Sequence, residues 1–230
     1  MNTMLPFERY RKAMDLIAEI CIDSAADSIL KPTASDRTVV AAATVLLHGF
    51  REIEGTFKSL CLIEALVGGA APRSKQVHKN DYLKFLIGAY LQEVYILDQR
   101  LTTYAKKIER IYITSVDVTA ILTVVKKIFQ SIVRLRGEHV HVKRYTDTRL
   151  DILEGVAFVE QIFSGLNITA AREYVKIRDE WLCFVKNNNA TTEAALEDYF
   201  GCLLAGITSD GILMLPRTGR GYCHTIPLDA

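Results

Sequence analysis

The stretch DYLKFLIGAYLQEVYILDQRLTTYAKKIERI, residues 81–111, decides the fold. Its apolar residues recur in steps of four and three, so on an α-helix they form one continuous stripe, with the charged residues on the other side. The spacing predicts one long central helix, about 45 Å long at ~1.5 Å per residue. A heptad seam of this kind packs against another helix of the chain or against a second copy. The seam consists of Leu83, Ile87, Tyr90, Val94, Leu97, Leu101, Tyr104, Ile108 and Ile111.

The rest of the chain also shows helical periodicity, and the alternation typical of strands is almost absent. We therefore predict an all-α fold, a bundle of about six or seven helices. One domain is expected over 1–205, followed by an irregular C-terminal tail over 206–230, where four glycines and two prolines gather. The other predicted helices cover about 7–30, 35–67, 114–136, 150–163, 169–185 and 191–204.

Composition limits the classes of function. The 28 basic and 27 acidic residues nearly balance, so any site for a polyanion must be local. The five cysteines are odd in number and widely spread, which favours a reducing compartment over a disulfide framework. The longest charge-free apolar run, 38–50, is shorter than the ~18 residues of a membrane-spanning helix. We expect a soluble cytoplasmic protein that does not contact membranes.

RLRGEHVHVKRY, residues 134–145, is the best local candidate for a site, because it holds four cationic residues and two of the five histidines. As a helix end, it places arginines near the negative end of the helix dipole and Gly137 just past the last turn. That interpretation leaves the alternation of His139 and His141 with valines unexplained. An extended segment would place both imidazoles on one side.

A metal site is one interpretation, since two histidines two residues apart on an extended segment can share one ion. The remaining ligands would come from distant positions, and the four nearby cations disfavour a further positive charge. We therefore predict no metal and no cofactor. The candidate distant ligands are His48, His78, His224, Glu138 and Asp147.

A phosphodiester site is the other interpretation, because Arg can neutralise transition-state charge and His can move protons near neutral pH. Arg136 and His141 are separated by four residues, follow an apolar helical run, and precede YTDTRLDILE, an acidic restart of helix. This arrangement resembles the HEPN superfamily, whose signature is an Arg and a His four to six residues apart. Arg134 and His139 have the same spacing, but RGEHVH resembles the common form of the motif more closely.

The resemblance implies a compact helical bundle and a metal-independent endoribonuclease that acts on single-stranded RNA as a homodimer. Arg136 would stabilise the phosphate, and His141 would act as acid or base while the RNA 2′-hydroxyl attacks. An antitoxin-type protein partner is a further implication. Glu93 or Asp98 of the seam helix could orient Arg136. The accessory contacts to RNA would be Arg134, His139, Lys143, Arg144 and Tyr145.

A non-catalytic member of the same fold is the alternative. Active members usually carry a polar residue directly after the arginine, and this chain has Gly137 there. Such a protein would use the helical scaffold to bind a partner, an anion or a nucleotide.

Overall fold

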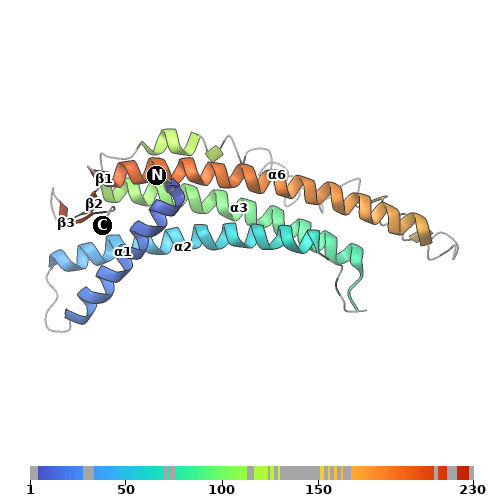
Figure 1. Cartoon of the computed structure of the whole chain (residues 1–230), viewed down its shortest axis with the longest axis horizontal. Coiled ribbons are helices and arrows are strands. Elements are labelled where there is room, and N and C mark those ends of the chain that lie inside the picture. The colour runs from blue at the N-terminus through green and yellow to red at the C-terminus, as the bar shows by residue number, and fades with distance from the viewer. Residues whose placement is uncertain are drawn as a thin grey trace. The chain divides into compact units, whose positions relative to one another are not determined.

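The structure of the 230-residue protein is a computed structural model. Helix is the main secondary structure of the residues that it describes, as Figure 1 shows, and the predicted all-α class is confirmed. Among these residues, no helix combines the length and apolar character that crossing a membrane requires. The described residues are 5–27, 34–69, 72, 76–112, 117–123, 125–126, 129, 151–152, 155, 158–159, 162, 167–209, 212–216 and 222–227.

Four long helices carry most of the described structure. Pro6 opens the first of them, at a position where its missing N–H costs nothing. Gly68 ends the second, as the run of glycines in the sequence predicted. The four helices are α1 (Pro6–Asp27), α2 (Ala34–Gly68), α3 (Lys79–Tyr112) and α6 (Asn167–Ile207).

The heptad seam lies on α3 and is buried almost as predicted. Eight of its nine positions, from Leu83 to Ile108, are at most 2% exposed. The last position differs, because Ile111 is partly exposed and Tyr112 is buried in its place. A straight helix drifts relative to a strict heptad repeat, so the stripe moves by one residue toward the end of a long helix.

The prediction of two helices at 169–185 and 191–204 is wrong, because α6 runs unbroken from Asn167 to Ile207. Thr191, expected to cap a new helix, instead donates a hydrogen bond from Oγ1 to the carbonyl of Asn187, 2.9 Å away, within the same helix. Threonine can bond to the preceding turn as well as cap a helix.

Described helical residues also occur within 118–129 and within 151–162. Asp117 begins the first group, since its Oδ1 accepts a hydrogen bond from the Ala120 N–H at 3.0 Å, the geometry of an N-cap. The sequence had placed this start at Thr114, which lies outside the described residues. The total of six or seven helices stays a prediction.

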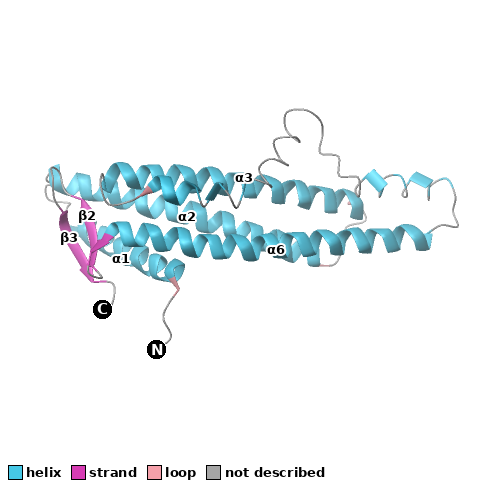
Figure 2. Ribbon diagram, turned by 90° about the horizontal axis from the view of Figure 1, so that it is seen from above, coloured by secondary structure: helices cyan, strands magenta, loops and turns pink. Residues whose placement is uncertain are grey.

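A small antiparallel sheet follows α6 (Figure 2). The tail over 206–230, which was predicted to be irregular, therefore contains strands. Its strands are β1 (Thr208–Ser209), β2 (Ile212–Pro216) and β3 (Tyr222–Pro227), in the order β1-β2-β3. Leu213 pairs with Thr208 on one side and Ile226 on the other, and its side chain is fully buried.

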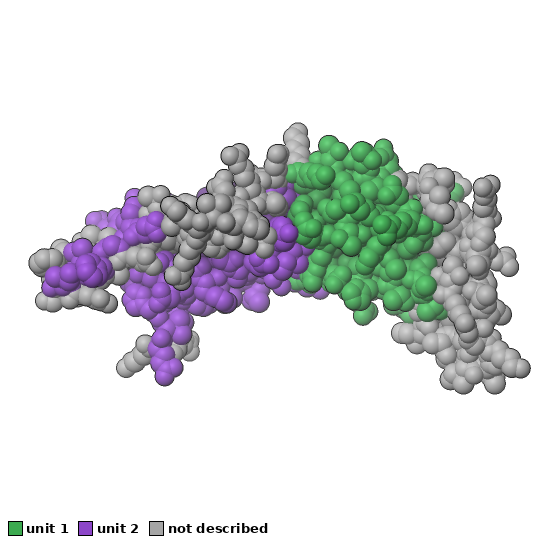
Figure 3. All heavy atoms as spheres, turned by 180° about the vertical axis from the view of Figure 1, so that it is seen from behind, with its two compact units in different colours: residues 1–55, 98–128, 193–230 green, residues 56–97, 129–192 purple. Residues whose placement is uncertain are grey.

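The chain divides into two compact units, coloured separately in Figure 3. Unit 1 contains 1–55, 98–128 and 193–230, and unit 2 contains 56–97 and 129–192. The helices α2, α3 and α6 therefore each supply residues to both units. The expectation of one domain over 1–205 stays a prediction.

The core of unit 1 is aromatic. The Phe200 ring, fully buried, lies at its centre, with ring centroids of four neighbours within 5.5 Å. Phe7 stacks on it at 5.0 Å, and Phe50 and Tyr199 meet it edge-on. Tyr10 contacts it at 4.7 Å. Each such pair adds to the free energy gained from burying the rings, so this cluster fixes α1, α2 and α6 within the unit.

The core of unit 2 is mainly aliphatic along α2 and α3, with Trp181 of α6 buried against it. The Trp181 indole meets the Phe184 ring edge-on at 5.2 Å. Gly68 faces Leu182, so that a Cβ there would lie 3.4 Å from a Leu182 methyl group. Three helices thus share this core, and the buried polar residue Asn189 lies among them.

Candidate functional site

The residues predicted to form the site lie outside the described part of the chain. The structure therefore neither brings them together nor separates them. They are Arg136 and His141, with the accessory Arg134, His139, Lys143, Arg144 and Tyr145.

The described residues nearest to this segment in sequence belong to the helical group at 118–129. Val118, Ile121 and Val125 are buried, in agreement with the apolar spacing of the predicted helix. Lys126 lies on the same group, ten residues before Arg136.

Asp98 of α3 is the described carboxylate that is electrostatically coupled to this helical group. Burial raises its pKa, while the amide of Gln99, 3.2 Å away, and the Lys126 ammonium favour the charged form. Asp98 is therefore half-buried, and its carboxylate interacts electrostatically with the Lys126 ammonium. Glu93, the other carboxylate considered for orienting Arg136, also lies on α3 and is partly exposed.

In unit 1 the buried polar atoms are phenol hydroxyls. Tyr104 donates to the carbonyl of Leu46 at 2.9 Å, so the 2.7 Å contact between the two phenols must use the proton of Tyr10. Tyr199 donates to the carbonyl of Leu101 at 2.8 Å. Burial raises the pKa of all three tyrosines well above the ordinary phenol value. They remain neutral at physiological pH and act as packed hydrogen-bond donors, not as general bases.

In unit 2 the buried hydrogen-bonding group is the side-chain amide of Asn189. Asn189 is 4% exposed, and its Nδ2 donates to the Leu60 carbonyl at 3.3 Å and to Glu64 Oε2 at 2.8 Å. Its Oδ1 accepts from the Tyr90 hydroxyl at 3.0 Å. Burial, followed by the nearby Glu64 and Cys61, raises the pKa of Tyr90, so that the phenol keeps the proton it donates.

This cluster joins α2, α3 and α6 through one side chain and uses both N–H groups and the oxygen of the amide. Both N–H groups of the amide are already bonded within the fold, so we interpret the cluster as structural. Sequence reasoning missed it. The available signal was the run Asn187, Asn188 and Asn189 between apolar residues that keep helical spacing on both sides.

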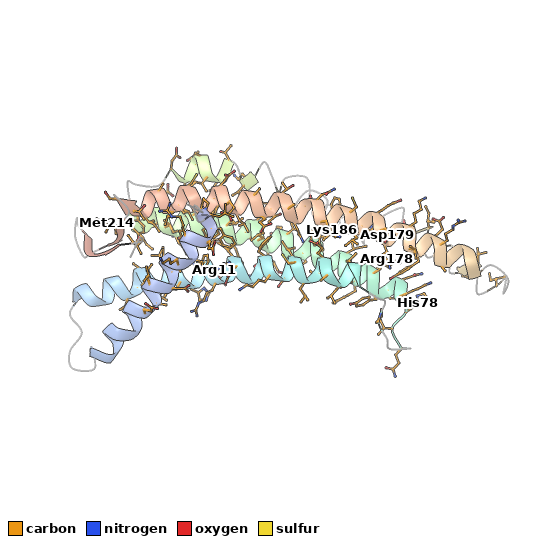
Figure 4. The ribbon with its side chains drawn as sticks, in the orientation of Figure 1. Arg11, His78, Arg178, Asp179, Lys186 and Met214 are labelled. Atoms are coloured by element: carbon orange, nitrogen blue, oxygen red, sulfur yellow. The ribbon has the colours of Figure 1, made fainter. Side chains whose placement is uncertain are left out.

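The start of α3 holds a second polar cluster. His78 Nδ1 accepts from the Asn80 N–H at 3.4 Å, and the Lys79 ammonium lies 5.1 Å from the centre of the Tyr174 ring. Figure 4 shows His78 at this end of α3, and Arg178, with its neighbour Asp179, on α6. Asn80 is 6% exposed, and its Oδ1 has no hydrogen-bond partner among the described residues. A buried carbonyl oxygen of this kind can accept a hydrogen bond from water.

The described ranges contain no group of three or more His, Cys, Asp or Glu side chains that could hold a metal ion. Cys61, Cys183 and Cys202 lie at exposed positions.

Comparisons with known proteins find no match for the chain among protein-family models, curated proteins or solved structures.

Proposed function

We propose that the protein is an HEPN-like endoribonuclease that cleaves single-stranded RNA without a metal. The observation that carries the proposal is the spacing of Arg136 and His141 directly after an apolar helical run. The mostly helical fold supports it, as do the helical residues at 118–129 and 151–162, which flank the motif on both sides. The finer architecture, six or seven helices around the helix at 81–111, belongs to the same proposal.

The chemistry follows from the two side chains. The 2′-hydroxyl of the RNA attacks the adjacent phosphorus, and the Arg136 guanidinium stabilises the negative charge that develops on the phosphate oxygens. His141 accepts the proton of the nucleophile or donates one to the leaving 5′-oxygen. Five neighbouring residues would hold the RNA: Arg134, His139, Lys143, Arg144 and Tyr145.

The proposal includes cellular context and partners. The protein would act in the cytoplasm as a homodimer, with RNA as substrate and an antitoxin-type protein as a further partner. Glu93 or Asp98 of α3 would orient Arg136.

A non-catalytic HEPN-like binding module is the second candidate, and Gly137 is the observation that favours it. Glycine provides no side chain that could contact the phosphate next to Arg136. Such a module would bind an anion or a nucleotide through the same basic segment.

Cleavage of a labelled single-stranded RNA in the presence of EDTA tests the proposal. Arg136→Ala and His141→Ala should each lower the rate at least about a hundredfold, the contribution of one charge-stabilising or proton-transferring group. Arg134→Ala and His139→Ala are matched controls, since this pair has the same spacing. They should weaken binding and leave a measurable rate.

Three results would oppose the proposal in different ways. If all proteins show the same background cleavage, the enzyme is excluded. If RNA binds to the parent protein and is not cut, the second candidate is favoured. If the control pair abolishes cleavage and Arg136→Ala does not, the catalytic pair is Arg134 and His139.

A further inference from the structure

A carboxylate of α2 holds two basic side chains on the surface of unit 1. Arg100 of α3 donates a hydrogen bond from Nη1 to the carbonyl of Glu52 at 3.0 Å, and its Nη2 lies 3.9 Å from Glu52 Oε1. His48, one turn earlier on α2, has its Nδ1 3.3 Å from Glu52 Oε2. The side chains of Arg100, Glu52 and His48 are 36%, 40% and 69% exposed. Glu52 therefore aligns basic groups of two helices on one accessible surface.

The contacts between α2 and α3 indicate how this surface continues. Arg100 bonds to Glu52 and Tyr104 bonds to Leu46, so the two helices run antiparallel here. Lys107 stands seven residues after Arg100, which returns it to the same side of α3 about two turns, or ~10 Å, further along. Lys107 is exposed as well.

Two arginines extend this surface. Arg51 stands three residues after His48 on α2 and is exposed. Arg110 stands three residues after Lys107 on α3 and is exposed too. The surface therefore carries four side chains that are charged at any physiological pH. We name them the cationic strip: Arg51, Arg100, Lys107 and Arg110.

The strip concentrates positive charge in a protein whose formal net charge is +1. Glu52 contacts the strip through Arg100, whereas Glu54 is held on another side of α2 by Arg11 of α1, with 2.8 Å between Arg11 Nε and Glu54 Oε1. The cations of α3 extend over about 15 Å of the helix and do not converge on one point. This arrangement fits an extended polyanion better than a single small anion.

The surrounding surface distinguishes between two kinds of polyanion, a nucleic acid and an acidic protein. Among the described residues, the large apolar side chains exposed in unit 1 are Leu5 and Val40, and the others of this kind belong to unit 2. Protein interfaces are organised around apolar and aromatic anchors. Nucleic acid strands are bound largely through their phosphates by Arg and Lys. The strip therefore matches a nucleic acid strand.

We propose that the cationic strip is a second contact for RNA, which holds the phosphate backbone of a single strand. Phosphate contacts position a nucleic acid and carry no sequence information, so the strip binds RNA of any sequence. The choice of RNA rests on the proposed function. The strip contains no residue of the motif at 134–145, and its binding does not require cleavage.

Binding of a labelled 2′-O-methyl RNA strand to the full chain, measured by fluorescence anisotropy at several salt concentrations, tests the strip. This strand has no free 2′-hydroxyl to attack the phosphate, so binding is measured without cleavage. Arg51→Gln and Lys107→Gln should each weaken binding about fivefold at about 0.1 M salt. Each should also reduce the steepness of log K against log salt by about 0.7, the value for one phosphate contact of a single strand.

Lys186→Gln is the matched control. Lys186 is exposed on α6 (Figure 4) and does not belong to the strip. Its replacement removes the same charge and should leave both the affinity and the salt dependence unchanged. Circular dichroism should show the helical signal of the parent protein for every variant.

An added charge gives a second measurement that an unfolded variant cannot imitate. Thr103 is exposed on α3 between Arg100 and Lys107. Thr103→Lys should add one phosphate contact, so binding should tighten about fivefold at the same salt and its salt dependence should steepen by about 0.7. Thr103→Glu should weaken binding.

A parent protein that does not bind the strand overturns the inference, and so does binding that the strip variants leave unchanged or that Lys186→Gln weakens equally. Poly-glutamate that displaces the strand as well as unlabelled RNA does would assign the strip to acidic peptides and overturn the choice of RNA.

Failure of the proposed function would look different. If the strip variants weaken binding and no RNA is cleaved, only the nuclease is rejected. If cleavage requires Arg136 and His141 while the strip variants bind as the parent protein does, only the strip is rejected.

Discussion

Both units bury polar groups inside a helical core, but the kind of hydrogen-bonding side chain differs between them. Unit 1 buries Tyr10, Tyr104 and Tyr199, whose hydroxyls end at a backbone carbonyl or at another phenol. Unit 2 buries Asn189, whose amide has three hydrogen-bond partners. A tyrosine adds a large apolar ring to the core along with its hydrogen bond. Asn189 adds little apolar area, so unit 2 depends on the hydrogen bonds themselves.

Alkaline pH should produce the largest change in the free energy of unfolding. Burial raises the native pKa of Tyr10, Tyr104, Tyr199 and Tyr90, whereas in the unfolded chain these phenols titrate near 10. Above pH 10 the unfolded state therefore binds fewer protons than the native state, and the free energy of unfolding falls as pH rises. Each phenol contributes about 1.4 kcal/mol per pH unit, and this stabilisation is complete below pH 10.

Circular dichroism and tyrosinate absorbance, recorded together from pH 8 upward, measure this effect. The buried phenols should ionise in the same step in which the helical signal is lost. Three of these four phenols belong to unit 1, so removing one there should leave a steep transition. Tyr90→Phe should remove the contribution of the fourth, which belongs to unit 2. Ionisation of all ten tyrosines near pH 10 with the helical signal intact would refute the prediction.

The dependence of unit 2 on its amide gives the next largest effect. Asn189→Leu should lower the free energy of unfolding by about 3 kcal/mol, because the Tyr90 hydroxyl and the Glu64 carboxylate lose a buried partner. Tyr199→Phe in unit 1 keeps the ring and should cost only about 1 kcal/mol. Urea unfolding followed by circular dichroism measures both.

Asn187→Ala is the matched control within the same asparagine run. Asn187 is exposed, and its Nδ2 contacts only the sulfur of Cys183, at 3.6 Å, so the change should stay within about 0.5 kcal/mol. Equal losses for Asn189→Leu and Tyr199→Phe would remove the contrast between the two units.

The same contrast explains which parts of the fold could be predicted. The seam on α3 could be predicted because its apolar spacing is local and regular, and the end of α2 near Gly68 because two consecutive glycines there favour a helix end. The continuity of α6 could not, since the partners of Asn189 lie on other helices, at Leu60, Glu64 and Tyr90. Local sequence shows three asparagines and two threonines there, which is typical of a break.

The strands were missed for a related reason. The sheet has three short strands of two, five and six residues, so the alternation that identifies strands has little length in which to appear. Gly and Pro near the strands favoured an irregular segment. The candidate site itself rests on a motif at 134–145, outside the described residues, and its arrangement stays a prediction.

The packing of the phenols in unit 1 should give a smaller effect than the loss of the amide in unit 2. A Cβ on Gly49 of α2 would lie 3.1 Å from Tyr104 Cγ and closer still to two other ring carbons. The Tyr104 ring is buried and its hydroxyl is held by Leu46, so it has no room to move away. Gly49→Ala should therefore cost about 2 kcal/mol, even though alanine is the better helix former.

Gly55→Ala tests this explanation six residues further along α2. A Cβ there meets nothing within 4 Å, so only the helix propensity changes, and the free energy of unfolding should rise by up to about 1 kcal/mol. The opposite signs of the two substitutions, measured by urea unfolding, would assign the cost at Gly49 to the Tyr104 ring. If both substitutions stabilise the protein, the Tyr104 ring can move away from the added methyl group. The hydrogen bonds of unit 1 would then hold its core less rigidly than the amide of Asn189 holds the core of unit 2.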